Sequence, residues 1–328
     1  MLTSYEGLYA IIPTPAKEGA GHLLARDTVD LDETSRVIEK LIAAGAGGLI
    51  TLGTTGECAT LGEDDYRAFV DCVLDTVSRR IPVLVGTTAL GGHQTASRMK
   101  YIRERRADGT LLGLPIWQPL TQREAVDWYA SMSEAFPEIA IMVYANARAF
   151  RFDFSNLAFW EEVGRAAPTV TSAKMSRPKD LPELIRQTGG RINFMPNEST
   201  VHSAYALSPE TTTACWATAA AMDPKPALAI MDAVRRRDEL AVSALSAAIA
   251  WANDPVDVII KDPDVFAKFN IQVEKTRIAA AGYCKPGPCR PPYDDLPADF
   301  RAAAEECGRR WAALCANDCK VPAAVQGT

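Results

Sequence analysis

The sequence predicts a (β/α)8 TIM barrel, an α/β fold, followed by a C-terminal helical extension. Two observations lead to this prediction. Eight short apolar runs recur along the first 220 residues, and a helical pattern follows most of them. After residue 222 the strand signals stop and four helical segments follow. The length of 328 residues suits one large barrel of roughly 200–250 residues with such an extension.

The eight predicted strands are separated by connections that are long enough for crossover helices. We expect strands at residues 7–13, 47–53, 82–87, 110–116, 139–145, 169–174, 191–195 and 212–217. Their start-to-start spacing falls from about 40 to about 20 residues, which leaves room for a helix between parallel strands. A doubly wound sheet is the rival arrangement. However, the turn after the first strand reads PTPAKEGAG and lacks the GxGxxG fingerprint of that class.

The first helix, expected at Asp30–Ala44, shows how the sequence marks helix ends and faces. Asp30 and Glu33 have the spacing of a capping box. Val37, Leu41 and Ala44 share one face, which we expect to pack on the barrel. The same reasoning predicts the late helices Pro224–Arg237, Glu239–Asn253, Asp264–Ala281 and Pro297–Asn317.

The late helices suggest how the chain is divided. The first of them completes the barrel, so we expect a catalytic domain at residues 1–237 and the extension at residues 238–328. The segment KPGPCRPPY (285–293) is rich in proline and glycine and is expected to be an irregular crossing loop within the extension.

Composition excludes several classes of protein. The formal net charge of −6 argues against a nucleic-acid-binding surface, and no apolar run approaches the ~20 residues that span a bilayer. The first residues lack the pattern of a secretory signal. Eight cysteines without a CxxC pair, together with three histidines, make a disulfide scaffold or a structural zinc site a poor fit. We therefore expect a cytoplasmic protein with no nucleic-acid or membrane partner.

Lys174 is the first candidate for catalysis. Catalytic groups of such barrels gather at the carboxyl ends of the strands, and Lys174 closes the sixth predicted strand, TVTSAK. Small and apolar neighbours would desolvate its ammonium group, lower its pKa and free the amine to attack a carbonyl carbon. The alternative is that Lys174 has simply reached the solvated rim of the barrel.

Tyr144 and Asn146 are candidates at the end of the fifth strand. Alternation along IAIMVYAN puts the β-branched residues on one face and Tyr144 and Asn146 on the other, which we expect to point into the barrel. A phenol in that position could transfer protons during catalysis. A core tyrosine with a satisfied hydroxyl is the alternative.

The segment GTTGE follows the second strand and offers a compact anion cradle. The hydroxyls of Thr54 and Thr55 and the backbone N–H groups of a glycine-permitted turn suit one carboxylate. No GK[ST] follows, so the segment is not a phosphate-binding loop. An ordinary strand-to-helix turn is the alternative.

Trp117 and Trp216 also fall at predicted strand ends and could wall a pocket for a flat apolar substrate, although simple packing would also explain them.

These motifs resemble those of the pyruvate-dependent class I aldolases, the superfamily of dihydrodipicolinate synthase and N-acetylneuraminate lyase. The resemblance rests on GTTGE after strand two, YxN at strand five and a lysine closing strand six. In that superfamily the lysine forms a Schiff base with pyruvate, the tyrosine relays protons and the threonine pair holds the carboxylate. The resemblance implies these roles for Lys174, for Tyr144, and for Thr54 with Thr55.

One branch of the superfamily is more similar. GTTGECATL (53–61), YANARAF (144–150), KFNIQVEKTRIAAAGYCKPGPCRPPY (268–293) and GRRWAAL (308–314) resemble the hydratase-aldolases of aromatic-hydrocarbon breakdown. These lyases act on trans-o-hydroxybenzylidenepyruvate or its carboxybenzylidene counterpart. The resemblance implies a homo-oligomer, usually a homotetramer, with no metal or organic cofactor besides the covalent Schiff base on Lys174.

Two departures distinguish the chain from dihydrodipicolinate synthases. Those enzymes usually carry two tyrosines after the strand-four proline, where this chain has Pro115, Ile116 and Trp117. They also place a substrate-binding arginine five residues after the tyrosine. Here that position is Ala149, and Arg148 stands one step early. Both departures argue against lysine biosynthesis and fit a bulkier, aromatic partner.

Three further residues are candidates around the substrate. Asn270, in the segment KFNI, could approach the substrate from the extension, with a helix-surface or capping amide as the alternative. Glu198, in PNES after strand seven, is a candidate pocket residue. Arg177, just past the lysine strand, could pair with a carboxylate on the ring, although basic residues at helix starts are usually solvated.

Three functions remain open from the sequence. The leading hypothesis is a Schiff-base hydratase-aldolase that cleaves a substituted benzylidenepyruvate to an aromatic aldehyde and pyruvate. The second is another pyruvate-dependent aldolase or dehydratase, similar to dihydrodipicolinate synthase, that acts on a sugar acid or a semialdehyde. The third is a non-catalytic keto-acid-binding protein. It is disfavoured because Lys174, Tyr144 and both threonines are present, whereas non-catalytic relatives commonly lose at least one such residue.

Overall fold

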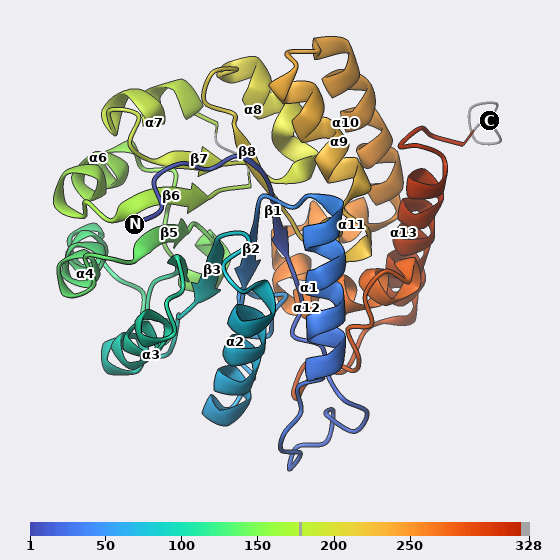
Figure 1. The fold of residues 1–328 in the computed structure, drawn as a ribbon, viewed down its shortest axis with the longest axis horizontal. Coiled ribbons are helices and arrows are strands. Elements are labelled where there is room, and N and C mark those ends of the chain that lie inside the picture. The colour runs from blue at the N-terminus through green and yellow to red at the C-terminus, as the bar shows by residue number, and fades with distance from the viewer. Residues whose placement is uncertain (177–178, 323–328) are drawn as a thin grey trace.

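Eight parallel strands form the centre of the protein (Figure 1). The structure is a computed structural model that describes residues 1–176 and 179–322. The strands run in the order β7-β6-β5-β4-β3-β2-β1-β8. They are β1 (Gly7–Ile11), β2 (Gly48–Thr51), β3 (Val83–Gly86), β4 (Gly109–Leu112), β5 (Ala140–Tyr144), β6 (Val170–Lys174), β7 (Asn193–Met195) and β8 (Ala214–Ala217).

The two edge strands of this order, β7 and β8, meet just beyond the end of β7. Asn197 and Trp216 form a parallel bridge, and the backbone N–H of Trp216 donates to the carbonyl oxygen of Pro196 at 2.9 Å. Because β1 already pairs with β8, this contact closes the sheet into a barrel. The predicted fold class and all eight predicted strands are confirmed, although each strand is shorter than predicted.

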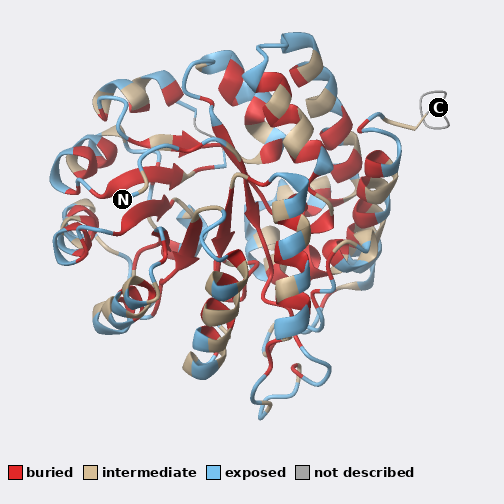
Figure 2. Cartoon of the chain, viewed as in Figure 1, coloured by how far each residue is buried: buried red, intermediate tan, exposed pale blue. Residues whose placement is uncertain are grey.

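Helices surround the barrel, and Figure 2 shows their buried faces turned toward the strands. The connections also contain the 3-10 turns η1 (Glu198–Thr200) and η2 (Ala219–Met222). The helices are α1 (Leu31–Ala44), α2 (Glu63–Val77), α3 (Gly92–Glu104), α4 (Gln122–Ala135), α5 (Ala147–Phe150), α6 (Leu157–Ala166), α7 (Leu181–Gln187), α8 (Val201–Leu207) and α9 (Lys225–Arg235).

Helix α1 has half of its predicted capping box. The Asp30 side chain accepts from the backbone N–H of Glu33 at 2.9 Å, as predicted. The Glu33 side chain does not return to Asp30. It accepts from the guanidinium group of Arg36 and from the backbone N–H of Lys285 in the crossing loop. A hydrogen bond from a charged guanidinium group is stronger than one from a neutral backbone N–H such as that of Asp30. Ala44 was expected on the packed face but is exposed at the last turn of the helix.

The C-terminal extension is helical, as predicted. It consists of α10 (Glu239–Asn253), η3 (Asp254–Val256), α11 (Asp257–Ile260), α12 (Pro263–Ala281) and α13 (Ala298–Ala316). The boundary expected at residue 237 falls between α9 and α10, but the hydrophobic core continues across it through Ile249, Ile278 and Trp311. The division into two folding units therefore stays a prediction.

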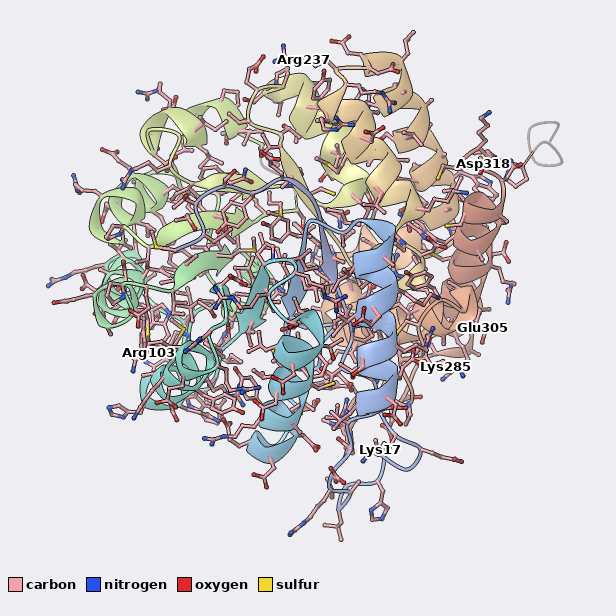
Figure 3. All side chains as sticks on the ribbon, in the orientation of Figure 1. Lys17, Arg103, Arg237, Lys285, Glu305 and Asp318 are labelled. Carbon is pink, nitrogen blue, oxygen red and sulfur yellow. The ribbon has the colours of Figure 1, made fainter. Side chains whose placement is uncertain are left out.

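The crossing loop between α12 and α13 returns to the barrel and packs beside α1. Lys285, labelled in Figure 3, marks this position. Cys284, just before this irregular loop, and Arg290, within it, are buried. The loop therefore carries residues of the extension into contact with the connections that follow β1 and β2. Among the helices of the described residues, none combines the length and apolar character that crossing a membrane requires.

Candidate active site

Lys174 lies at the end of β6, beside the ends of β5 and β7. The strand register pairs it with Tyr144 on one side and Met195 on the other. Its Nζ atom lies 3.4 Å from the centre of the Trp216 ring and 4.8 Å from the centre of the Tyr144 ring. Burial of the ammonium group lowers the pKa of Lys174 to about 7, and the nearby Glu198 and Glu274 oppose part of this shift. A neutral amine is therefore accessible near neutral pH.

Tyr144 points into the barrel mouth, as the alternation along β5 predicted. Its hydroxyl oxygen is hydrogen-bonded to Thr54 Oγ1 at 2.8 Å and accepts from Asn146 Nδ2 at 3.3 Å. Burial raises the pKa of the phenol, so it stays protonated and can both donate and accept a hydrogen bond. The structure thus brings Lys174, Tyr144, Asn146 and Thr54 together from β6, β5 and the turn after β2.

The turn at 53–57 is compact and leaves donors unused. The backbone N–H of Glu57 donates to the Thr54 carbonyl at 2.9 Å and closes the turn. Thr55 is buried. Within the described part of the chain, the backbone N–H groups of Thr55 and Gly56 donate to no protein acceptor. Two spare N–H donors beside the Thr54 hydroxyl form an arrangement suited to a carboxylate.

The two candidate tryptophans differ in position. Trp216 is buried against Lys174, and its Nε1 atom has no hydrogen-bond partner among the described residues. Trp117 is 80% exposed and does not lie at a strand end, so that expectation was wrong. Strand β4 ends at Leu112 because the next N–H, of Gly113, donates to Thr88 Oγ1 instead of the ladder. Trp117 therefore lies in the following loop, where its carbonyl accepts from Arg151 at 2.7 Å.

Asn270 lies in the interior of α12, which rules out a capping role. Its Oδ1 atom is buried and has no hydrogen-bond partner in the described part of the chain. No hydrogen bond links Asn270 to Lys174 or Tyr144 among the described residues, so its place in the site stays a prediction. Arg177 was a further candidate and lies outside the described residues.

Glu198 begins η1, directly after β7, and is 2% exposed. Its carboxylate accepts from Asn197 Nδ2. Burial raises the pKa of Glu198 to about 7, and the positive charge of Arg277 opposes this shift. Glu198 and Lys174 also interact electrostatically: Glu198 raises the pKa of Lys174, and Lys174 lowers the pKa of Glu198. Two interacting groups of the barrel mouth therefore have pKa values of about 7.

The comparisons with known proteins identify the family. A model of the dihydrodipicolinate synthetase family matches residues 22–149. Trans-O-hydroxybenzylidenepyruvate hydratase-aldolase of Pseudomonas aeruginosa is 37% identical over 311 residues, which are 94% of this chain and 92% of the relative. The chain belongs to the hydratase-aldolase branch of the dihydrodipicolinate synthetase family. Trans-2'-carboxybenzalpyruvate hydratase-aldolase of Nocardioides sp. (strain KP7), 33% identical over 94% of this chain and 93% of the relative, is a second member of that branch.

Two solved structures are similar to this chain over most of its length. The structure of PhdJ bound to substrate intermediate has a TM-score of 0.91 and 32% identity, and the match covers 95% of this chain and 97% of that one. A 4-hydroxy-tetrahydrodipicolinate synthase from Methylacidiphilum fumariolicum SolV shares the fold, with a TM-score of 0.82 at 17% identity over 96% of this chain and 98% of that one. The resemblance inferred from the sequence motifs is therefore confirmed.

Arg148 does not replace the arginine that synthases of the family carry near this position. Its guanidinium group donates to the Pro263 carbonyl at 3.2 Å and lies 5.4 Å from the centre of the Phe266 ring. Arg148 therefore joins α5 to the start of α12 in this hydratase-aldolase family member. No group of three or more metal-ligating side chains occurs among the described residues, and the expectation of catalysis without a metal stays a prediction.

Buried charges of the extension are the residues that the sequence analysis missed. Lys275 and Arg290 both bind Glu57, and Arg277 binds Glu274 with two nitrogens. A signal for Glu274, Lys275 and Arg277 was present in the segment IQVEKTRIAAA, where charges stand among apolar residues on all sides of a helix. Such charges are expected to be buried in pairs, but the pattern does not name the partner.

Proposed function

We propose that the protein is a Schiff-base-forming hydratase-aldolase that cleaves a substituted benzylidenepyruvate to an aromatic aldehyde and pyruvate. The observation that carries this proposal is the Lys174 amine with a pKa of about 7, in contact with Trp216 and beside Tyr144. The two hydratase-aldolases similar to this chain are named for benzylidene- and benzalpyruvate substrates, and the family makes the protein a lyase.

The first step needs the neutral form of Lys174. The amine adds to the keto carbon of the substrate, and loss of water gives an iminium ion that is conjugated with the alkene. The iminium withdraws electrons, so water can add at the alkene carbon that bears the aryl group, while the other alkene carbon takes up a proton. Tyr144 is placed to move these protons because its hydroxyl stays protonated and is held by Thr54 and Asn146.

The second half of the reaction uses the same iminium as an electron sink. Removal of the proton from the new hydroxyl, by Tyr144 with Asn146 or a water molecule, breaks the carbon–carbon bond and releases the aldehyde. The electron pair passes into an enamine on Lys174. Protonation of that enamine and hydrolysis of the iminium release pyruvate and restore the amine, so the net reaction consumes one water molecule.

The remaining site residues bind the two ends of the substrate. Thr54, Thr55 and the spare N–H groups of their turn hold the carboxylate, and Trp216 lies against the conjugated chain. The Trp216 Nε1 donor and the Asn270 Oδ1 acceptor are buried and have no hydrogen-bond partner in residues 1–176 and 179–322, which suits them to polar groups of the substrate or its water. Trp117 reaches only the outer end of an aryl group in this proposal.

The assembly and location of the protein are proposals as well. We infer a homotetramer in the cytoplasm that needs no metal or organic cofactor. The absence of disulfides supports this location, because all eight cysteines lie in the described residues and are free thiols. Sedimentation analysis of the purified protein measures the oligomeric state.

Borohydride reduction in the presence of pyruvate tests the proposed function. We expect a stable adduct on Lys174 in peptide mass spectra and no adduct in Lys174→Ala. Folded protein whose lysine stays unmodified would contradict the proposal. Turnover of hydroxy-, carboxy- and unsubstituted benzylidenepyruvates is then compared with aliphatic 2-oxo acids. Preference for the aliphatic set would favour a sugar-acid or semialdehyde lyase instead.

A further inference from the structure

Glu57, the last residue of GTTGE, is the centre of a buried ionic cluster that includes two residues of the extension. Its carboxylate is 0% exposed. Lys275 Nζ donates to Oε2 at 2.9 Å, and Arg290 Nη1 donates to the same oxygen at 2.5 Å. The backbone N–H of Arg290 donates to Oε1 at 2.7 Å. Both carboxylate oxygens are therefore held by groups from α12 and the crossing loop.

The turn that Glu57 closes has a strained backbone. Leu52 and Glu57, which bracket the two threonines, both adopt left-handed conformations with φ of 55° and 54°. Such conformations cost about 1–3 kcal/mol each and persist where surrounding contacts hold them. A side chain at Gly56 would lie 2.7 Å from the Leu52 nitrogen, and one at Gly86 would lie 2.1 Å from the Leu52 carbonyl oxygen. The turn is thus closely packed and depends on its neighbours.

The cluster also ties the turn to the chain after β1. Arg290 donates to the carbonyls of Thr14 and Thr28 and to the Thr28 hydroxyl. The Thr14 hydroxyl in turn donates to the Gly56 carbonyl at 2.8 Å, inside the turn itself. Lys275 adds a bond to the Pro288 carbonyl of the crossing loop at 2.6 Å. The position of the turn is therefore set by long-range contacts.

We propose that Glu57 is a positioning residue which, through Lys275 and Arg290, holds the Thr54–Thr55 turn in the geometry that binds the carboxylate of a 2-oxo acid. This inference rests on the carboxylate-binding role given to the turn in the proposed function. Hydrogen-bond donors bind an anion well only when they are fixed within about 0.5 Å of the productive geometry. Releasing the Glu57 end of the turn would let Leu52 and Glu57 relax toward less strained conformations and would misdirect the N–H groups of Thr55 and Gly56 between them.

Glu33 provides a matched control for a purely structural role. It is also buried, binds Arg36 through two bonds of 2.6 Å, and accepts from the backbone N–H of Lys285 at 2.6 Å. It therefore anchors the same crossing loop at its other end, and within the described part of the chain it forms no hydrogen bond or ion pair with the 53–57 turn. Loss of Glu33 loosens the loop without releasing the turn.

The test is borohydride trapping of the full chain over a range of pyruvate concentrations. We expect Glu57→Gln to raise the half-saturating pyruvate concentration between about 10- and 100-fold, while the trapping rate at saturating pyruvate stays close to the wild-type rate. Arg290→Lys keeps the positive charge but loses part of the hydrogen bonds of the guanidinium group. We expect it to give a smaller rise in the half-saturating pyruvate concentration. Glu33→Gln is expected to lower the melting temperature but to leave the half-saturating concentration unchanged.

Each outcome decides between the proposals. If Glu57→Gln does not fold, Arg290→Lys carries the test. A folded Arg290→Lys or Glu57→Gln protein with the wild-type half-saturating concentration overturns the positioning role, and so does an equal rise in Glu33→Gln. Absence of any trapped adduct in the wild-type protein overturns the proposed function instead.

Discussion

Glu57 and Glu198 are two buried carboxylates on different sides of the barrel mouth, and they differ in their partners. Glu57 follows β2 and binds two cationic side chains. Glu198 follows β7 and, within the described part of the chain, forms no ion pair, and its pKa is raised to about 7. Burial alone disfavours the charged form of a carboxylate, whereas a cation bound to the carboxylate favours that form. We infer that Glu57 holds structure through its two ion pairs and that Glu198, with a pKa of about 7, interacts electrostatically with Lys174.

Arg277 explains why Glu198 stays unpaired. The guanidinium group of Arg277 is committed to Glu274, at 2.8 to 3.0 Å, and to the Asn253 side-chain oxygen at 3.1 Å. It therefore acts on Glu198 only from a distance. A cation therefore pairs with a buried carboxylate only when its donors are not already used by other acceptors.

The largest effects on stability are expected when Glu57 and Glu198 are removed one at a time. Glu57→Ala leaves two buried cations without their partner, and we expect a loss of about 3–5 kcal/mol in the free energy of unfolding. Glu198→Ala removes a group with no ion pair and is expected to cost less. Urea denaturation of both variants measures the difference. Equal losses would mean that the two carboxylates contribute to stability in the same way.

Tyr144 contacts both the turn after β2 and the end of β6, since it is hydrogen-bonded to Thr54 and lies beside Lys174. Tyr144→Phe removes the hydroxyl but leaves the ring. We expect turnover to fall by about 10²–10⁴-fold, because proton transfer is lost, while borohydride trapping of pyruvate on Lys174 continues. Turnover measured together with trapping separates the two steps. Unchanged turnover would remove Tyr144 from the mechanism.

Glu57 and Glu198 should also differ in their effect on the pH dependence of borohydride trapping. Because the neutral amine reacts and the pKa of Lys174 is about 7, the trapping rate should rise with pH and level off above that value. The charged form of Glu198 raises the pKa of Lys174, so Glu198→Gln should move the rise to lower pH, by about one unit or less. Glu57→Gln, assayed at saturating pyruvate, should leave its position unchanged. A shift toward higher pH in Glu198→Gln would contradict the assignment.

The same pKa predicts a trend in stability. The folded protein holds the Lys174 proton less tightly than the unfolded chain, whose lysine has a pKa near 10.5. The free energy of unfolding contributed by this group should therefore rise with pH between about 7 and 10.5. Denaturation of the wild type and Lys174→Met across this range measures the trend. Parallel pH dependences of the two proteins would show that the amine is not desolvated.

The smallest change in stability is expected for a substitution of Trp117, in the loop after β4. Trp117 is exposed and only its backbone carbonyl is held, so Trp117→Ala should change the free energy of unfolding by no more than about 0.5 kcal/mol. Its effect on KM for benzylidenepyruvates should be smaller than that of Trp216→Ala. A larger effect would show that the loop closes over the aryl group when substrate binds.

The architecture was predictable because its signals are local. The runs that form β2 and β6 and the helix α10 depend on apolar residues repeated within each segment, so their existence and type follow from neighbouring residues. Strand ends were less predictable. Strand β4 stops before Gly113 because the backbone N–H of Gly113 donates to the Thr88 side chain, which is distant in the sequence. The short helix α5 escaped prediction because four residues carry no period.

Lys174, Tyr144 and Thr54 could be placed together from the sequence because parallel strands of a closed barrel end at one mouth and side chains alternate along each strand. Only the tertiary structure decided that Glu57 meets Lys275 and Arg290, which are 218 and 233 residues away along the chain. It also decided that Arg148 faces α12. The physical reason is that periodicity specifies which face of an element is buried, whereas the pairing of buried charges depends on the path of a loop whose own sequence has no period.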